Sequence, residues 1–146
     1  MSTSAAVHVS AQAERLHADC WRVVEGDRVE LIARCCAKCG TSYLPKALTC
    51  VRCGNRSFNP QVLSPRGTLY TYSIVHGSGG VWPEVYAVGY VDFPEGVRVF
   101  GQLRESSPAT LCVGAQVEVE PALLYRRKDG TDVTCYRFFV SDKGGA

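Results

Sequence analysis

The 146-residue sequence predicts a mainly β protein: a short N-terminal helix, a zinc ribbon and then a five-stranded β-barrel of the OB type. Two observations predict this arrangement. Two C-x-x-C pairs, each followed by glycine and separated by ten residues, have the spacing of a small module held together by a metal ion. Beyond residue 60, five short apolar or alternating segments are separated by turn residues, which is typical of a small antiparallel barrel.

The composition is that of an ordinary globular domain. Hydrophobic residues make up 46% and charged residues 21%, and no apolar run approaches the roughly 20 residues that span a bilayer. The first residues lack the pattern of a secretion signal, so we expect a cytoplasmic protein with no membrane segment. In that reducing compartment, closely spaced cysteines are expected to bind metal rather than form disulfides.

The net charge of +2 is unevenly distributed along the chain. Residues 31–82 carry six basic residues and no acid, whereas residues 84–125 carry six acids and two arginines. A basic surface attracts nucleic acid, an acidic protein or a phosphorylated cofactor, and the charge alone does not choose among them. A merely solvated face is the other interpretation.

Residues 1–33 are expected to form a tail and one helix. Met1–Ala13 shows no sustained periodicity and is interpreted as the tail. Glu14–Glu25 places apolar residues at helical spacing, and Gly26 would end the helix. Val29–Ala33 is then expected to be a short strand that leads to the first cysteine pair.

Residues 34–60 are expected to form the zinc ribbon. Each C-x-x-C-G motif presents two thiolates to one ion, and its glycine allows the tight turn between them. The predicted metal ligands are Cys36, Cys39, Cys50 and Cys53. Because four protein ligands leave no position for a substrate, the metal should be structural. Zinc is the preferred ion, and iron, as in rubredoxin, is the alternative.

No catalytic group is predicted among the other cysteines and the histidines. Cys35 adjoins the first motif and offers another pairing with Cys39, but the x-x spacing favours Cys36. His76 precedes the glycine-rich segment Gly77–Gly80, where a structural role is the stronger expectation and a ligand contact the weaker one. Three further cysteines are expected to be buried free thiols: Cys20, Cys112 and Cys135.

Residues 61–146 are expected to form the barrel, after a linker over Asn59–Pro65. The turn Phe93–Gly96 joins the second and third of its strands into a hairpin. Five short strands suit an OB-type barrel better than a sandwich, which usually has seven or more. The predicted strands are Thr68–His76, Val85–Asp92, Val97–Arg104, Gln116–Tyr125 and Val133–Val140.

Taken together, these motifs resemble a family of OB-fold proteins with a rubredoxin-like zinc ribbon that is associated with acyl-CoA metabolism. The sequence departs slightly from that family at Val51, where proline is frequent, and at Leu44-Pro45, where two prolines are frequent. The residues that carry the resemblance are Trp21, Gly26, Arg34, Cys36, Cys39, Gly40, Tyr43–Pro45, Cys50–Gly54, Gly67–Ser73, Gly96–Val99 and Gly114–Val117.

The resemblance implies a non-catalytic, zinc-binding accessory subunit of a heteromeric acyl-CoA-processing enzyme. The partner would be a thiolase-like subunit, either a thiolase or an aldolase that forms or cleaves a C–C bond. Related hydroxymethylglutaryl-CoA synthases and hydratase-like enzymes are the other partners that the resemblance implies. A coenzyme A ester would bind at their interface, where Lys38, Arg52 and Arg56 are candidates to meet its phosphates. Four aromatic residues would either anchor the partner or, as the stronger expectation, lie in the core: Tyr70, Tyr72, Trp82 and Phe100.

Two other functions compete with this one. Single-stranded nucleic-acid binding is the serious alternative, because zinc ribbons and OB barrels also occur in such proteins. The acidic barrel region and the modest net charge of +2 argue against it. A rubredoxin-like electron carrier is the third candidate, and it would contain coloured iron rather than zinc.

Overall fold

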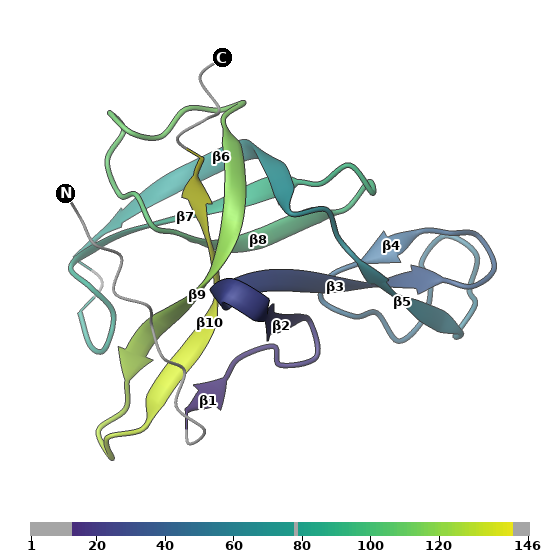
Figure 1. Cartoon of the computed structure of the whole chain (residues 1–146), viewed down its shortest axis with the longest axis horizontal. Coiled ribbons are helices and arrows are strands. Elements are labelled where there is room, and N and C mark those ends of the chain that lie inside the picture. Colours follow the sequence, from purple (N-terminus) through teal and green to yellow (C-terminus); the bar gives the residue numbers. More distant parts are fainter. Residues whose placement is uncertain (1–12, 78, 142–146) are drawn as a thin grey trace.

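The computed structural model describes residues 13–77 and 79–141, and it confirms the mainly β class (Figure 1). The only helical element in these residues is a short 3-10 turn, η1 (Glu25–Asp27). None of the elements described is a helix with the length and hydropathy needed to cross a membrane. The predicted tail, Met1–Ala13, lies outside the described residues apart from Ala13.

Five strands close into the barrel that the sequence predicted. Neighbouring strands pair in the order β6-β7-β8-β10-β9, and β9 pairs with β6 to complete the circuit. The β8–β10 pair is parallel, and the other pairs are antiparallel. This closed five-stranded arrangement is an OB fold. The strands are β6 (Arg66–His76), β7 (Val85–Asp92), β8 (Arg98–Leu103), β9 (Gln116–Arg126) and β10 (Asp132–Val140).

Apolar side chains that alternate along the strands fill the barrel interior. Val99, Gly101 and Leu103 of β8 face inward. Gly101 lies against the ring of Phe138, which is completely buried. A Cβ atom added to Gly101 would come 2.6 Å from Cε2 of Phe138, so this position has no room for a side chain.

The predicted helix over Glu14–Glu25 is wrong, because these residues form two short strands. β1 (Glu14–Arg15) pairs with β10, and β2 (Trp21–Val24) pairs with the next strand along the chain. Trp21 is 1% exposed, and the guanidinium of Arg15 lies 4.1 Å from the centre of its ring. A short, weakly periodic segment is a marginal helix, and strand pairing with distant residues overrides that local preference.

A second sheet forms the ribbon, which projects away from the barrel (Figure 1). Its central strand is β3 (Arg28–Cys36), which pairs with β2 at its start. Towards its end, β3 pairs with β4 (Ser42–Tyr43) and β5 (Phe58–Val62). The predicted strand Val29–Ala33 is therefore part of a longer one.

The predicted linker Asn59–Pro65 is wrong in its first half, where the chain forms β5. Because β5 pairs only with β3, it is an edge strand, and an edge strand tolerates a proline such as Pro60 that has no N–H to donate. The predicted domain boundaries at 33/34 and 60/61 fall within β3 and β5. The division into three parts stays a prediction.

A hydrogen-bonded contact fixes the point where the ribbon joins the barrel. The backbone N–H and the hydroxyl of Ser64 donate to the two carboxylate oxygens of Glu95, at 3.0 and 2.6 Å. Partial burial raises the pKa of Glu95, but the hydrogen bonds from Ser64 outweigh it and hold that pKa below its ordinary value. The β5–β6 connection is thereby attached to the turn between β7 and β8.

The Gly101→Ala substitution tests the close packing inside the barrel. Because the added Cβ atom would come 2.6 Å from the completely buried ring of Phe138, we expect a loss of about 1–3 kcal/mol in the free energy of unfolding. Urea denaturation measures it, with the half-buried neighbour Gln102→Ala as the control. Equal stability of the Gly101→Ala variant and the unsubstituted chain would contradict the packing described above.

Candidate metal centre

Four thiols meet in the ribbon: Cys36, Cys39, Cys50 and Cys53, whose Sγ atoms all lie within 4.8 Å of one another. The Cys36–Cys53 and Cys39–Cys50 sulfur pairs are each 3.5 Å apart. Zinc–sulfur bonds of about 2.3 Å in a tetrahedron place sulfurs roughly 3.8 Å apart, so the cluster has the right size for one ion. The structure brings together all four predicted ligands.

Two tight turns of the same form hold these thiols. The amide of Gly40 donates to the carbonyl of Cys36 at 3.0 Å, and the amide of Gly54 donates to that of Cys50 at 2.8 Å. Both glycines have positive φ, 79° and 78°, which other residues adopt only with strain. The glycine that follows each C-x-x-C pair is therefore required by the turn.

Polar groups around the cluster lower the pKa of two of its thiols, Cys36 and Cys50. Backbone amides, that of Cys39 most strongly, lower the pKa of Cys36 to about 6. The hydroxyl of Tyr43, 3.3 Å from the sulfur, lowers the pKa of Cys50. The backbone amide of Asn55 acts to lower the pKa of Cys53, but burial and the three neighbouring thiols raise that pKa to about 11. Four crowded sulfurs can all ionise only around a cation, so the donor set fits a metal ion.

Three side chains that support the sulfurs were not predicted from the sequence. The hydroxyl of Thr41 lies 3.1 Å from Cys39 Sγ, and the side-chain amide of Asn55 donates a hydrogen bond to Cys36 Sγ at 3.5 Å. Tyr43 is the third. Thr41 and Asn55 directly follow the two turn glycines, and that repeated polar position is a signal that could have identified them.

The other cysteines lie outside the cluster. Cys35 turns its sulfur toward the carbonyl of Gly40 at 3.4 Å, so the geometry groups Cys36 rather than Cys35 with the other three. Cys20 and Cys135 are buried as expected, and burial raises the pKa of both, to about 11 for Cys135. Cys112 is exposed, so the expectation of a buried thiol is wrong there, because the residue falls in the loop after β8.

The aromatic residues also depart from the stronger expectation, that they lie in the core. Tyr72 is half-buried and packs against the core, but Tyr70, Trp82 and Phe100 are exposed. Tyr70 and Phe100 occupy outward positions of the barrel strands, and Trp82 lies in the loop before β7. Aromatic composition alone does not distinguish the two faces of a strand.

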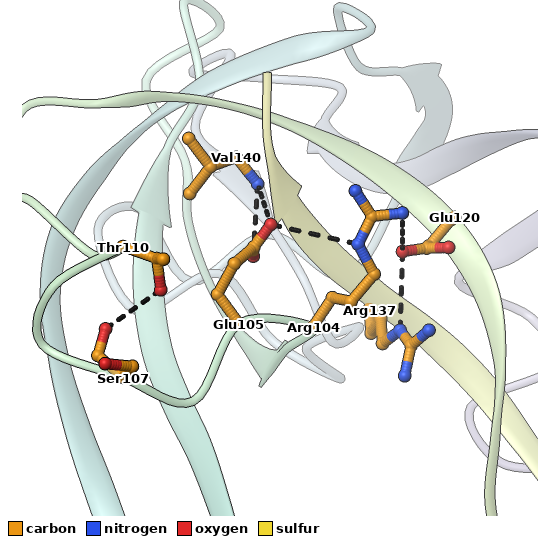
Figure 2. A network of polar contacts seen from close by, with 7 residues as sticks. All are labelled: Arg104, Glu105, Ser107, Thr110, Glu120, Arg137 and Val140. Carbon is orange, nitrogen blue, oxygen red and sulfur yellow. Dashed lines mark hydrogen bonds and ion pairs between the residues drawn. The ribbon is translucent and has the colours of Figure 1, made fainter. Parts of the chain in front are cut away.

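A groove of about 780 Å³ lies between η1, β3 and the strands β9 and β10. Figure 2 shows charged side chains beside this groove, from β9, β10 and the loop after β8. Arg104 and Arg137 approach the same carboxylate oxygen of Glu120, at 3.2 and 3.4 Å. The carboxylate of Glu105 accepts a hydrogen bond from the backbone amide of Val140 at 3.1 Å and forms an ion pair with Arg104 at 3.8 Å. Each guanidinium is matched by a carboxylate, so this network joins the strands and offers no uncompensated charge.

A tetracysteine ribbon joined to a closed OB barrel defines the class of zinc-ribbon OB-fold proteins. Family models match both parts: the ChsH2 rubredoxin-like zinc ribbon domain over residues 25–59 and the ChsH2 C-terminal OB-fold domain over residues 60–120. The chain belongs to the DUF35 family of such proteins. The resemblance inferred from the sequence is confirmed.

Curated relatives and a solved structure agree with this assignment. A DUF35 domain-containing scaffold protein of Methanocaldococcus jannaschii is 33% identical over 117 residues, 77% of this chain and 79% of that protein. Benzoylsuccinyl-CoA thiolase subunit BbsA of Thauera aromatica is 34% identical over 105 residues, 70% of this chain and 71% of that protein. The solved Ltp2-ChsH2(DUF35) aldolase has the same fold, with a TM-score of 0.60 and 22% identity over 74% of this chain and 84% of that one.

Substitution of Cys39 by serine tests the predicted ligand set. We expect the Cys39→Ser variant to lose its metal and its ribbon fold, because the ion supplies much of the folding free energy of such a module. Metal analysis and hydrogen exchange of the ribbon amides measure the two effects. Cys35→Ser is the matched control and should retain one equivalent of metal. A full equivalent in the Cys39→Ser variant would show that the ligands are wrongly assigned.

Proposed function

We propose that this chain is a non-catalytic, zinc-binding accessory subunit of a heteromeric acyl-CoA-processing enzyme. Its partner is a thiolase-like subunit, a thiolase or an aldolase that forms or cleaves a C–C bond, and the two form a hetero-oligomer in the cytoplasm. The observation that carries the proposal is the 34% identity to BbsA, a thiolase subunit, across most of both chains. The relation to a scaffold protein supports the non-catalytic role.

The metal in this proposal is a structural zinc ion held by the cluster of four cysteines. The spacing of the sulfurs fits a tetrahedral thiolate site, and the match to a zinc-ribbon family model supports zinc over iron. The ion uses all four of its positions on protein sulfur, so its contribution is to order the ribbon. The reacting groups belong to the partner.

A coenzyme A ester at the partner interface would meet the basic side of the ribbon. Lys38, Arg52 and Arg56 are exposed there, and none of them forms an ion pair with another described residue. Arg104 and Arg137 in the barrel groove are instead matched by Glu105 and Glu120. A cation without an ion-pair partner can bind phosphate without first losing a carboxylate, which makes the free energy of binding more favourable. The ribbon is therefore the better site for the phosphates.

Binding of single-stranded nucleic acid is the alternative function, and the exposed aromatic side chains on the barrel favour it. The compensated arginines and the acidic composition of the barrel argue against it. A salt-dependent mobility shift of labelled single-stranded DNA or RNA would support this alternative. No shift at low salt would exclude it.

Purification of the chain from its native host tests the proposed function. We expect a thiolase-like protein to co-purify, to lose acyl-CoA activity when this chain is removed, and to regain it on addition of the zinc-loaded chain. The chain stripped of metal is the control and should restore little activity, because its ribbon is unfolded. If the isolated chain turns over acyl-CoA thioesters at an enzyme-like rate, the role as an accessory subunit is wrong.

A further inference from the structure

The outward face of β6, β7 and β8 is aromatic where a barrel surface is usually polar. Tyr70, Tyr90 and Phe100 are 50%, 43% and 51% exposed. Tyr90 and Phe100 are directly paired across β7 and β8, and Tyr70 is the extra residue of a β-bulge opposite Tyr90. The outer face of an antiparallel sheet is expected to carry polar side chains, and an exposed apolar cluster marks an interaction surface.

These rings are already held in place in the free protein. The centres of the Tyr90 and Phe100 rings are 5.3 Å apart, and the guanidinium of Arg98 lies 3.5 Å above the ring of Tyr70. Arg98 is fixed in turn by Asp92, with an Nε–Oδ1 distance of 2.6 Å. Binding to ordered side chains costs less conformational entropy than binding to mobile ones.

An apolar hollow of about 200 Å³ adjoins this face. Phe100 and Trp82 line it, and Trp82 packs against Tyr86 and Tyr125, with ring centres 5.6 and 5.0 Å apart. The hydroxyl of Tyr136, another lining residue, donates to the carbonyl of Phe100 at 2.7 Å. The hollow is smaller than the roughly 300–1,000 Å³ typical of small-molecule sites, so its size suits a single inserted side chain.

The charges on this face favour a protein over a nucleic acid as its binding partner. Among the described residues, Arg98 is the only cation that contacts a ring of this face, and Asp92 neutralises it. One side of the Tyr70 ring is covered by Arg98, and Tyr90 and Phe100 pack edge to face, so they do not form a row of open rings for stacking bases. A neutral patch of tyrosine, tryptophan and arginine beside a pocket has the composition of a protein interface centre.

We propose that this aromatic face, defined by Tyr70, Tyr90, Phe100 and Trp82, docks on the thiolase-like partner. An uncharged apolar side chain of the partner inserts between Trp82 and Phe100. The inference rests on the proposed function, because that function supplies the partner. It assigns the barrel face to partner docking and leaves the basic ribbon for the coenzyme A ester.

The Phe100→Ser substitution tests the docking face. We expect the variant to bind the purified thiolase-like partner at least about tenfold more weakly than the unsubstituted chain, as measured by titration calorimetry. The control is Val23→Ser, which removes an exposed apolar side chain of β2 in the other sheet. Equal metal content and equal melting temperature of the two variants exclude a folding defect as the cause.

Tryptophan fluorescence gives an independent readout of the same contact. Trp21 is buried, so a change on binding reports Trp82. Addition of the partner should shift the emission to shorter wavelength and protect it from iodide quenching, and Phe100→Ser should reduce both effects.

Three results would overturn the proposal. The first is partner binding that Phe100→Ser leaves unchanged. The second is a homodimer of this chain that Phe100→Ser separates, because the face would then serve a second copy. The third is oligonucleotide binding that is lost in the same variant. If no thiolase-like protein binds the unsubstituted chain, the proposed function fails first and this inference fails with it.

Discussion

The ribbon depends on one interaction, the coordination of a single metal ion by four thiolates. Within residues 34–60 the buried hydrophobic residues are Cys36, Leu44 and Cys50, and two of these belong to the cluster itself. So small a core cannot offset the conformational entropy of ordering the segment. The ion replaces a hydrophobic core, and the positive φ angles of Gly40 and Gly54 allow the backbone turns that bring the sulfurs together.

The barrel needs no metal, because its interior is filled by apolar side chains and its sheet is closed. Strand β3 starts beside the barrel and ends at the cluster, and the Ser64–Glu95 contact attaches the returning chain to the β7–β8 turn. Two surfaces of different chemistry are thereby held on one scaffold. The ribbon presents cations that form no ion pair with another described residue, and the barrel presents an aromatic face on which Asp92 neutralises Arg98.

Sequence patterns predicted the parts of this molecule that depend on local spacing. The C-x-x-C-G motifs located the cluster, and alternation with turn residues located all five barrel strands. The predictions that failed concern segments whose secondary structure depends on pairing with strands that are distant in the sequence. Glu14–Glu25 forms strands because β10 and β3 are available to pair with it, and Asn59–Val62 pairs with β3 despite Pro60. Alternation along β8 does place Phe100 on the face opposite Val99 and Gly101, but the bulge at Tyr70 interrupts the alternation along β6.

The central claim is that one zinc ion, held by four reduced cysteines, orders the ribbon as part of a platform for a catalytic partner. Native mass spectrometry of the intact chain, purified without added metal, tests it most directly. The account predicts a mass increased by a single zinc ion, with all eight cysteines in the thiol or thiolate form after the ion is removed. A metal-free chain in which the paired motifs are joined by disulfides would contradict it.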